Sequence, residues 1–283
     1  MTTVRLAFSP DSDDIFMFWP MLNGKVDTDG ITFEHERHDT ERLNRFAEEG
    51  TIDVCAVSIA HYATLANRYL LLPHGASVGR GYGPVVVATS PRTLESLAGK
   101  RIGIPGKRTT AYLALRLLLS DFEPVVVPIA PYARAFEAVR SGDVEASLLI
   151  HEGRLTYERE GFVKVCDVGE AWLARTGLPL PLGGNVIRRG LGADLIRRTS
   201  AVCRASIAWA LDHREEVMSA LLAEESRTDL KMSRSMLDEY LRMYANADTR
   251  ELPADARLAV STLLEEAFRV GLVSQKVVAE FAP

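Results

Sequence analysis

The sequence predicts an α/β fold with two lobes, mixed but mainly parallel sheets and a helical C-terminal region. Three observations support this. Short apolar runs alternate with amphipathic stretches, as in βαβ units whose sheets are covered on both faces. These runs fall into two series, before and after about residue 90, and from about Gly192 onward the pattern is almost entirely helical. A length of 283 residues is comfortable for two domains.

The first series opens with an apolar run at residues 4–8 that stops at Ser9-Pro10, as a buried strand does. A broad apolar face predicts a helix over 13–22, and alternation of apolar and polar residues predicts a half-exposed strand over 31–37. The same reasoning gives helices at 40–49 and 59–66 and strands at 54–57, 70–72 and 85–88.

The second series repeats this alternation and should form a second sheet. The expected strands are 101–104, 125–129, 146–150 and 163–168, and the expected helices are 94–99, 109–119, 134–141 and 152–160. The tail adds helices at 195–211, 214–223, 233–244 and 255–270.

Two series predict two lobes with a ligand cleft between them. The first lobe is expected to comprise residues 1–89 and 185–283, and the second lobe residues 90–184. The chain is expected to cross between them at Ser90-Pro91-Arg92 and at the Pro- and Gly-rich stretch 178–184. Because ligands of open α/β sheets bind beyond the carboxyl ends of the strands, the residues after each strand are the first candidates for a site.

Composition excludes several classes of partner. A net charge of −5 gives no electrostatic footprint for nucleic acid, and no stretch approaches the roughly 20 apolar residues that span a bilayer. We therefore expect a small-molecule partner, with no nucleic acid and no membrane. Arg5 and Ser9-Pro10 interrupt any leader-like apolar run, which predicts a cytoplasmic protein. The oligomeric state is left open.

Three cysteines, Cys55, Cys166 and Cys203, are far apart and lack CxxC spacing. Their pattern suggests neither a disulfide framework nor a zinc site. The acidic stretch Asp11-Ser12-Asp13-Asp14 matches no calcium-loop spacing either. It is explained either as a helix cap or as the wall of a site in which Ser9 or Ser12 contacts substrate hydroxyls. No metal is expected.

Two helix starts are suited to anion binding. Ser58 follows Ala56 and Val57 at a strand end and is expected to cap the next helix. Thr109 and Thr110 stand at another helix N-terminus, where hydroxyl and backbone donors suit a carboxylate, although two ordinary cap residues would look the same. The glycine-rich stretch 79–84 precedes a strand, so it predicts tight turns near a cleft or hinge rather than a dinucleotide loop.

His151 directly follows an expected strand, which carries it to the carboxyl edge of a sheet. An unperturbed pKa near 6.5 suits a histidine there to proton transfer at neutral pH. The alternative is a histidine that is hydrogen-bonded to loop backbone. No serine lies in a GxSxG elbow, so hydrolase mechanisms are disfavoured.

Together these residues resemble the menaquinone-biosynthesis family, whose members share the type II periplasmic-binding-protein fold. The resemblance runs from Leu6 to about Gly192. It comprises Ser9-Pro10 with Asp14 and Phe16, Leu43-Asn44-Arg45, Gly79-Arg80-Gly81, Pro105-Gly106, Thr109-Thr110-Ala111-Tyr112, Ile150-His151-Glu152 and the stretch 176–183.

The resemblance implies a lyase of the futalosine pathway that converts cyclic dehypoxanthinyl futalosine to 1,4-dihydroxy-6-naphthoate and dihydroxyacetone. It implies that His151 is the proton acceptor, that the positions of Ala56, Val57, Ser58, Thr110 and Ala111 line the substrate site, and that no cofactor is needed. Thr109 and Ser9 join this site by the strand-end argument. Two alternatives stay open: a non-catalytic solute-binding protein and a sister activity of the chorismate dehydratase type.

The chain departs from the family at two places in the expected site. Close members have Cys-Pro-Asn in place of Asp11-Ser12-Asp13, and often a lysine in place of Ala56. A lost lysine removes a cation that would pair with a substrate carboxylate, and Lys107, Arg108 or Arg80 are the expected substitutes.

Overall fold

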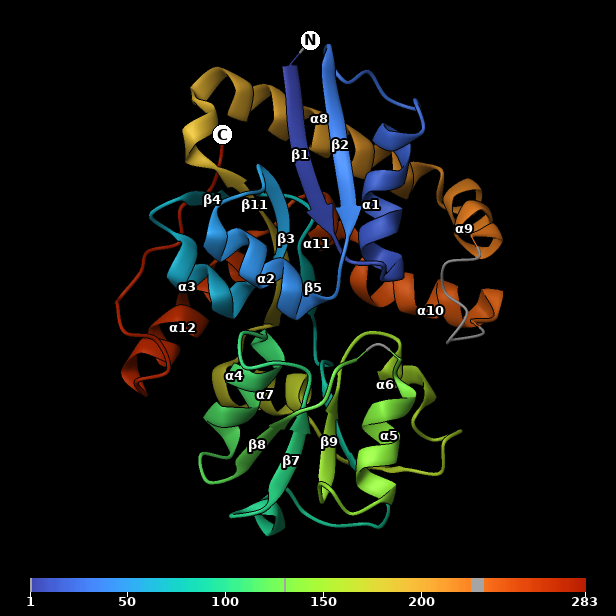
Figure 1. The fold of residues 1–283 in the computed structure, drawn as a ribbon, viewed down its shortest axis with the longest axis vertical. Coiled ribbons are helices and arrows are strands. Elements are labelled where there is room, and N and C mark those ends of the chain that lie inside the picture. Colours follow the sequence, from blue (N-terminus) through green and yellow to red (C-terminus); the bar gives the residue numbers. More distant parts are fainter. Residues whose placement is uncertain (1, 130, 225–231) are drawn as a thin grey trace.

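Two sheets, one above the other along the long axis, organise the molecule (Figure 1). This computed structural model describes residues 2–129, 131–224 and 232–283. The upper sheet has the order β2-β1-β3-β11-β4, and β5 also pairs with β11. Its strands are β1 (Thr2–Phe8), β2 (Ile31–Arg37), β3 (Val54–Ser58), β4 (Tyr69–Leu71), β5 (Ser77–Gly79) and β11 (Leu180–Arg188).

The lower sheet has the order β10-β6-β9-β7-β8. Its strands are β6 (Val85–Ala88), β7 (Arg101–Ile104), β8 (Glu123–Val126), β9 (Ala146–Leu149) and β10 (Val163–Asp167). The α/β class with mixed sheets is confirmed, but parallel pairing does not dominate as expected. Strand β1 is parallel to β2 and β3, and β7 to β8 and β9, whereas β6 and β11 are antiparallel to each described neighbour.

Helices cover both sheets, and the C-terminal region is helical as predicted. In the first half of the chain they are α1 (Ser12–Leu22), α2 (Thr40–Glu49), α3 (Tyr62–Leu65), α4 (Thr110–Leu118) and α5 (Ala133–Arg140). The second half adds α6 (Gly153–Thr156), α7 (Val168–Thr176), α8 (Ala193–Asp212), α9 (Arg214–Ala223), α10 (Arg234–Tyr244), α11 (Ala247–Arg250) and α12 (Ala254–Arg269). The helix expected over 152–160 is only the single turn α6, and 94–99 contains a 3-10 turn at Glu95–Leu97.

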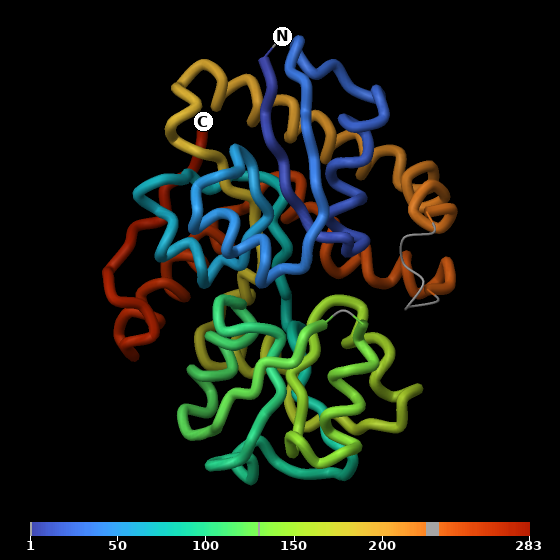
Figure 2. The backbone as a smooth tube through the Cα atoms, in the orientation of Figure 1, coloured from blue at the N-terminus to red at the C-terminus, as the bar shows by residue number. Residues whose placement is uncertain are grey.

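The chain crosses between the sheets twice (Figure 2): the first crossing differs from the expected place, and the second overlaps the start of the expected stretch 178–184. It leaves the upper sheet after β5 and enters the lower sheet at β6, so the first crossing lies at 80–84 and not at Ser90-Pro91-Arg92. It returns between α7 and β11. The stretch 180–184, expected as part of a loop, begins the strand β11.

Close packing explains why β11 contains residues that usually break strands. Its register against β5 shifts between Pro181 and Gly183, a place where a proline without an N–H group is tolerated. A Cβ atom on Gly184 would lie 2.9 Å from Ile59 Cδ1, so a larger residue there would require the end of the Ile59 side chain to shift.

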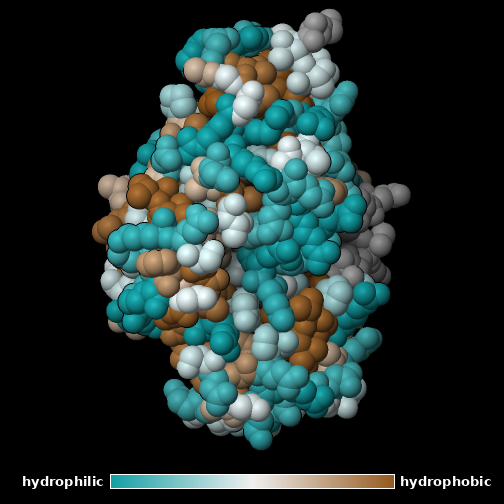
Figure 3. All heavy atoms as spheres, turned by 60° about the vertical axis from the view of Figure 1, so that its left-hand side comes forward, coloured by the Kyte–Doolittle hydropathy of each residue, from teal (hydrophilic) through white to brown (hydrophobic). Residues whose placement is uncertain are grey.

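Hydrophobic side chains fill one large core that runs through both lobes and a smaller one beneath α5 in the lower lobe. On the face turned forward in Figure 3, hydrophilic residues predominate and hydrophobic residues form separate patches. Among the described residues, no helix is both long enough and apolar enough to cross a membrane.

Substitution of Gly79, at the end of β5, tests how tightly the backbone packs at the first crossing. A Cβ atom there would lie 2.0 Å from the backbone oxygen of Tyr82, which cannot easily move away. We expect Gly79→Ala to lower the free energy of unfolding by about 1–3 kcal/mol, measured by urea denaturation. Gly190→Ala is the control, because its Cβ would meet nothing closer than 3.5 Å. Equal effects of the two substitutions would contradict the packing argument.

Candidate active site

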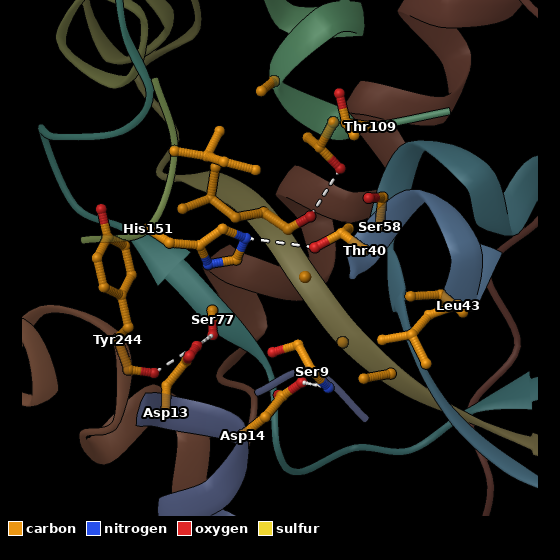
Figure 4. Close-up of a pocket in the computed structure, with 18 of the residues that line it drawn as sticks. Ser9, Asp13, Asp14, Thr40, Leu43, Ser58, Ser77, Thr109, His151 and Tyr244 are labelled. Atoms are coloured by element: carbon orange, nitrogen blue, oxygen red, sulfur yellow. Dashed lines mark hydrogen bonds between the residues drawn. The ribbon is translucent and has the colours of Figure 1, made fainter. Parts of the chain in front are cut away.

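A cavity lies between the two sheets and receives side chains from both lobes (Figure 4). It contains about 770 Å³ of empty space, which includes space open to solvent. The structure brings all the residues expected at the site to this one cavity: Ser9, Ala56, Val57, Ser58, Thr109, Thr110, Ala111 and His151. Their roles in binding and catalysis stay predictions.

The N-terminus of α4 forms one end of the cavity. Thr109 is its N-cap: the hydroxyl oxygen accepts the N–H of Tyr112 at 3.2 Å and donates to the Gly106 carbonyl at 2.8 Å. Thr110 instead connects the lobes, because its hydroxyl donates to the Leu182 carbonyl at 2.6 Å and accepts the N–H of Ala60 at 3.1 Å. The cap at Thr109 is therefore confirmed, while Thr110 makes contacts that no local pattern predicts.

Ser58 does not cap the turn that follows it, contrary to expectation. Its N–H donates to Asn44 Oδ1 at 3.0 Å, and its hydroxyl oxygen accepts Asn44 Nδ2–H at 3.2 Å. Asn44 is fully buried on α2, so this pair holds α2 against the end of β3. The expectation failed because a side chain 14 residues away satisfies Ser58 in place of the local backbone.

His151 occupies a strained position just after β9. Its φ is +50°, and among the described non-glycine residues only it and Asp29 have a positive φ. Nε2 lies 3.3 Å from Thr40 Oγ1, and Nδ1 lies 3.3 Å from the Tyr240 hydroxyl and 3.5 Å from Asp11 Oδ2. The ring thus contacts side chains of the first lobe, not its own loop backbone.

Two opposing effects set the protonation of His151. Burial lowers the pKa of the imidazole, but the negative charges of Asp11, Asp13 and Glu152 outweigh it, so the pKa is raised above the ordinary 6.5. A base in this setting is more basic than a free histidine, and it is neutral, and so able to accept a proton, only above its raised pKa.

The acidic turn at residues 11–14 points inward rather than capping α1. Asp11 is the N-cap residue but makes no side-chain cap bond. Asp13 accepts hydroxyl hydrogens from Tyr240 at 2.9 Å and Ser77 at 2.8 Å, and Asp14 accepts the Ser9 N–H at 2.7 Å. The cap explanation is therefore wrong for these side chains, which form part of the site wall.

Ser12 joins the acidic turn to the second lobe. Glu152 is fully buried, and its Oε1 accepts both the N–H of Ser12 at 3.3 Å and its hydroxyl at 3.0 Å. Glu152 Oε2 accepts the hydroxyl of Tyr132 at 3.3 Å. In the described part of the chain, no group of three or more His, Cys, Asp or Glu side chains could hold a metal ion.

The expected substitutes for a missing lysine do not reach the cavity. Arg108 pairs with Glu41 at 2.8 Å and Glu48 at 3.0 Å, and Arg80 pairs with Asp248 at 2.6 Å and Asp255 at 2.8 Å. Lys107 lines a separate depression beside α4. No lysine or arginine stands among the described residues that line the cavity, so its permanent donors are hydroxyl and backbone N–H groups.

Two tyrosines of the helical tail were missed by sequence reasoning. Tyr240 and Tyr244 lie one turn apart on α10, are buried, and line the cavity with ring centroids 4.9 Å apart. Their four-residue spacing indicates one face of a helix, but nothing in the sequence says that this face meets His151. The tail was expected to be only a generic helical region.

The chain as a whole is similar to proteins of known sequence and structure. A family model described as menaquinone biosynthesis matches residues 4–269. The chain is 40% identical over 274 residues to a 1,4-dihydroxy-6-naphthoate synthase of Thermus thermophilus, covering 97% of each protein. It is also similar to a crystal structure of a protein from Archaeoglobus fulgidus, with 41% identity and a TM-score of 0.89 over 96% of this chain and 98% of that one.

More distant structural relatives share the fold alone. The alkanesulfonate-binding protein from Xanthomonas axonopodis pv. citri is 14% identical, with a TM-score of 0.75 over 99% of this chain and 96% of that one. The two-lobed architecture is thus that of the periplasmic binding proteins.

The buried carboxyl of Asp14 gives a stability test of the site. Burial, and secondarily the charge of Asp13, raises the pKa of Asp14 from 3.8 to about 8. Between these two pH values the native state therefore binds more protons than the unfolded chain. Stability attributable to Asp14 is present at low pH and is lost as pH rises from about 4 to 8. We expect Asp14→Asn, which retains an acceptor for Ser9, to gain stability relative to the parent between pH 5 and 8.

Urea unfolding midpoints of the two proteins at several pH values provide the measurement. The exposed carboxyl of Asp121 supplies the control, and Asp121→Asn should follow the parent throughout. Parallel curves for the parent and Asp14→Asn would show that Asp14 is ionised in the native state.

Proposed function

The chain belongs to the menaquinone-biosynthesis family, and from this premise we propose that it is a lyase of the 1,4-dihydroxy-6-naphthoate synthase type. It converts cyclic dehypoxanthinyl futalosine to 1,4-dihydroxy-6-naphthoate and dihydroxyacetone. One observation supports the location of the active site: all eight residues predicted for it, His151 among them, line the same cavity.

The reaction requires removal of a proton, cleavage of a carbon–carbon bond and formation of an aromatic product, which favours the later steps. His151 is the base in this scheme, because its Nε2 faces Thr40 and the cavity. Enclosure between two lobes excludes water and holds the reacting carbon close to this nitrogen.

Neutral donors hold the anionic substrate. The first N–H groups of a helix have no acceptor within the helix, and the Thr109 hydroxyl takes only that of Tyr112. The N–H groups of Thr110 and Ala111 are therefore suited to bind the substrate carboxylate at the N-terminus of α4. Ser9 and Ser58 offer further hydroxyls for the substrate or its developing enolate oxygen.

A cytoplasmic location is part of the proposal. It is supported by the free thiols of Cys55, Cys166 and Cys203, two of which are buried, since unpaired cysteines are typical of a reducing compartment.

Incubation of the pure protein with cyclic dehypoxanthinyl futalosine tests the function. Formation of the naphthoate is followed by absorbance and mass spectrometry. Binding without turnover would instead indicate a solute-binding protein, and turnover of chorismate alone would indicate the sister activity.

The His151→Asn variant tests the role of the base. We expect kcat to fall by about 100-fold or more, because the variant lacks a group that can accept the proton, while substrate binding persists. His213→Asn, which changes an exposed histidine, is the matched control and should retain parental kinetics. Near-parental turnover by His151→Asn with substrate still bound would exclude His151 as the base.

The pH dependence of kcat/KM follows from the raised pKa of His151. Because the base must be neutral to accept a proton, kcat/KM should fall as pH falls through a midpoint above 6.5. An activity that is constant from pH 8 down to pH 6 would contradict this assignment. The measurement is initial-rate kinetics in a constant-ionic-strength buffer series.

A further inference from the structure

Tyr240 reaches the candidate base from an unexpected part of the chain. It lies on α10 in the helical tail, and its side chain is completely buried. Its hydroxyl oxygen is 3.3 Å from His151 Nδ1 and 2.9 Å from Asp13 Oδ1. A single hydroxyl group thus joins the imidazole of the second lobe to a carboxylate of the first.

The hydrogen-bonding capacity of these groups fixes the direction of each bond. A tyrosine hydroxyl has one hydrogen, and the Asp13 carboxylate takes it as an acceptor. The other oxygen of Asp13 accepts the Ser77 hydroxyl at 2.8 Å, so the carboxylate is held from both sides. With its hydrogen directed to Asp13, Tyr240 can serve His151 only as an acceptor.

The imidazole must then donate its Nδ1–H to the Tyr240 oxygen. Asp11 Oδ2, 3.5 Å from Nδ1, also favours a hydrogen on this nitrogen. In the neutral ring the lone pair is consequently on Nε2, which faces Thr40 and the cavity. The nitrogen required by the reaction is therefore the unprotonated one.

We propose that Tyr240 and Asp13 are positioning residues that fix the neutral His151 ring as the Nδ1–H tautomer. The lone pair that accepts the substrate proton is then on Nε2, 3.3 Å from the Thr40 hydroxyl. The inference rests on the proposed function for its catalytic meaning, since it assigns these residues a role through His151. Because Tyr240 and His151 belong to different lobes, the same hydrogen bond couples the orientation of the base to the arrangement of the lobes.

Titratable groups on several neighbouring elements face His151 and influence its pKa. The acidic turn and α1 contribute Asp11, Asp13 and Asp14, the second lobe contributes Glu152, and α10 contributes Tyr240. Burial raises the pKa of Tyr240 well above its ordinary value, so it stays a donor to Asp13 over the working pH range. Removing the charge of Asp13 or the acceptor of Tyr240 should lower the pKa of His151.

Nitrogen-15 NMR of the full-length protein labelled at histidine tests the tautomer directly. The signals of His151 are identified by their loss in His151→Asn. We expect the parent at pH above the His151 midpoint to show the Nδ1–H tautomer. We expect Tyr240→Phe and Asp13→Asn to weaken that preference and to lower the titration midpoint.

Kinetics supply a second readout. Tyr240→Phe should reduce kcat by at least about tenfold with KM changed less than about threefold, because the variant misorients the base without removing a substrate contact. Tyr69→Phe is the control: Tyr69 is equally buried and loses a 2.7 Å bond to the Ile52 carbonyl, but it lies away from the cavity. That variant should keep the parental tautomer, titration midpoint and kcat.

An Nε2–H tautomer in the parent, or an unchanged tautomer and midpoint in both Tyr240→Phe and Asp13→Asn, would overturn the proposal. If Tyr240→Phe does not fold, Asp13→Asn carries the same test. The NMR result needs no turnover, so it can fail while the lyase assignment stands, and it can succeed even if the protein acts on a different substrate.

Discussion

The acidic turn at residues 11–14, buried against His151, is the interaction on which the rest of the site depends. Buried carboxylates are costly unless each finds hydrogen-bond donors. The nearby Ser9 donates to Asp14, whereas Ser77 and Tyr240 donate to Asp13 from distant parts of the chain. The hydrogen bonds to these carboxyl groups therefore hold the end of β1, β5 and α10 beside the cavity and the base.

The same turn contains Asp11, Ser12 and Asp13, where the sequence is expected to depart from the family pattern. Each of these three residues contacts His151 or a residue that lies beside it. Asp11 lies beside Nδ1 of His151, Ser12 donates to Glu152, and Asp13 accepts from Tyr240. The cavity, by contrast, has no lysine or arginine among its described lining residues, so an anionic substrate depends largely on helix and hydroxyl donors.

Sequence reasoning selected residues that line one cavity, because strand ends are local features. Ser58 ends a strand of the upper sheet, and Thr109 and His151 follow strands of the lower sheet. These local positions could be predicted without knowledge of distant contacts. The same reasoning failed where distant packing overrides local preference. The start of strand β11 was taken for a loop, because Pro181, Gly183 and Gly184 disfavour a strand locally, whereas the irregular pairing with β5 accommodates them. Tyr240 was missed because a helical face does not reveal its partner.

A crystal structure of the His151→Asn variant with cyclic dehypoxanthinyl futalosine bound tests the central claim most directly. The account predicts the substrate between the two sheets, with its carboxylate at the N-terminus of α4. A carbon that carries the abstracted hydrogen should face the place that Nε2 of His151 occupies in the parent. Substrate bound outside this cavity, or with its reacting carbon turned away from that place, would contradict the account.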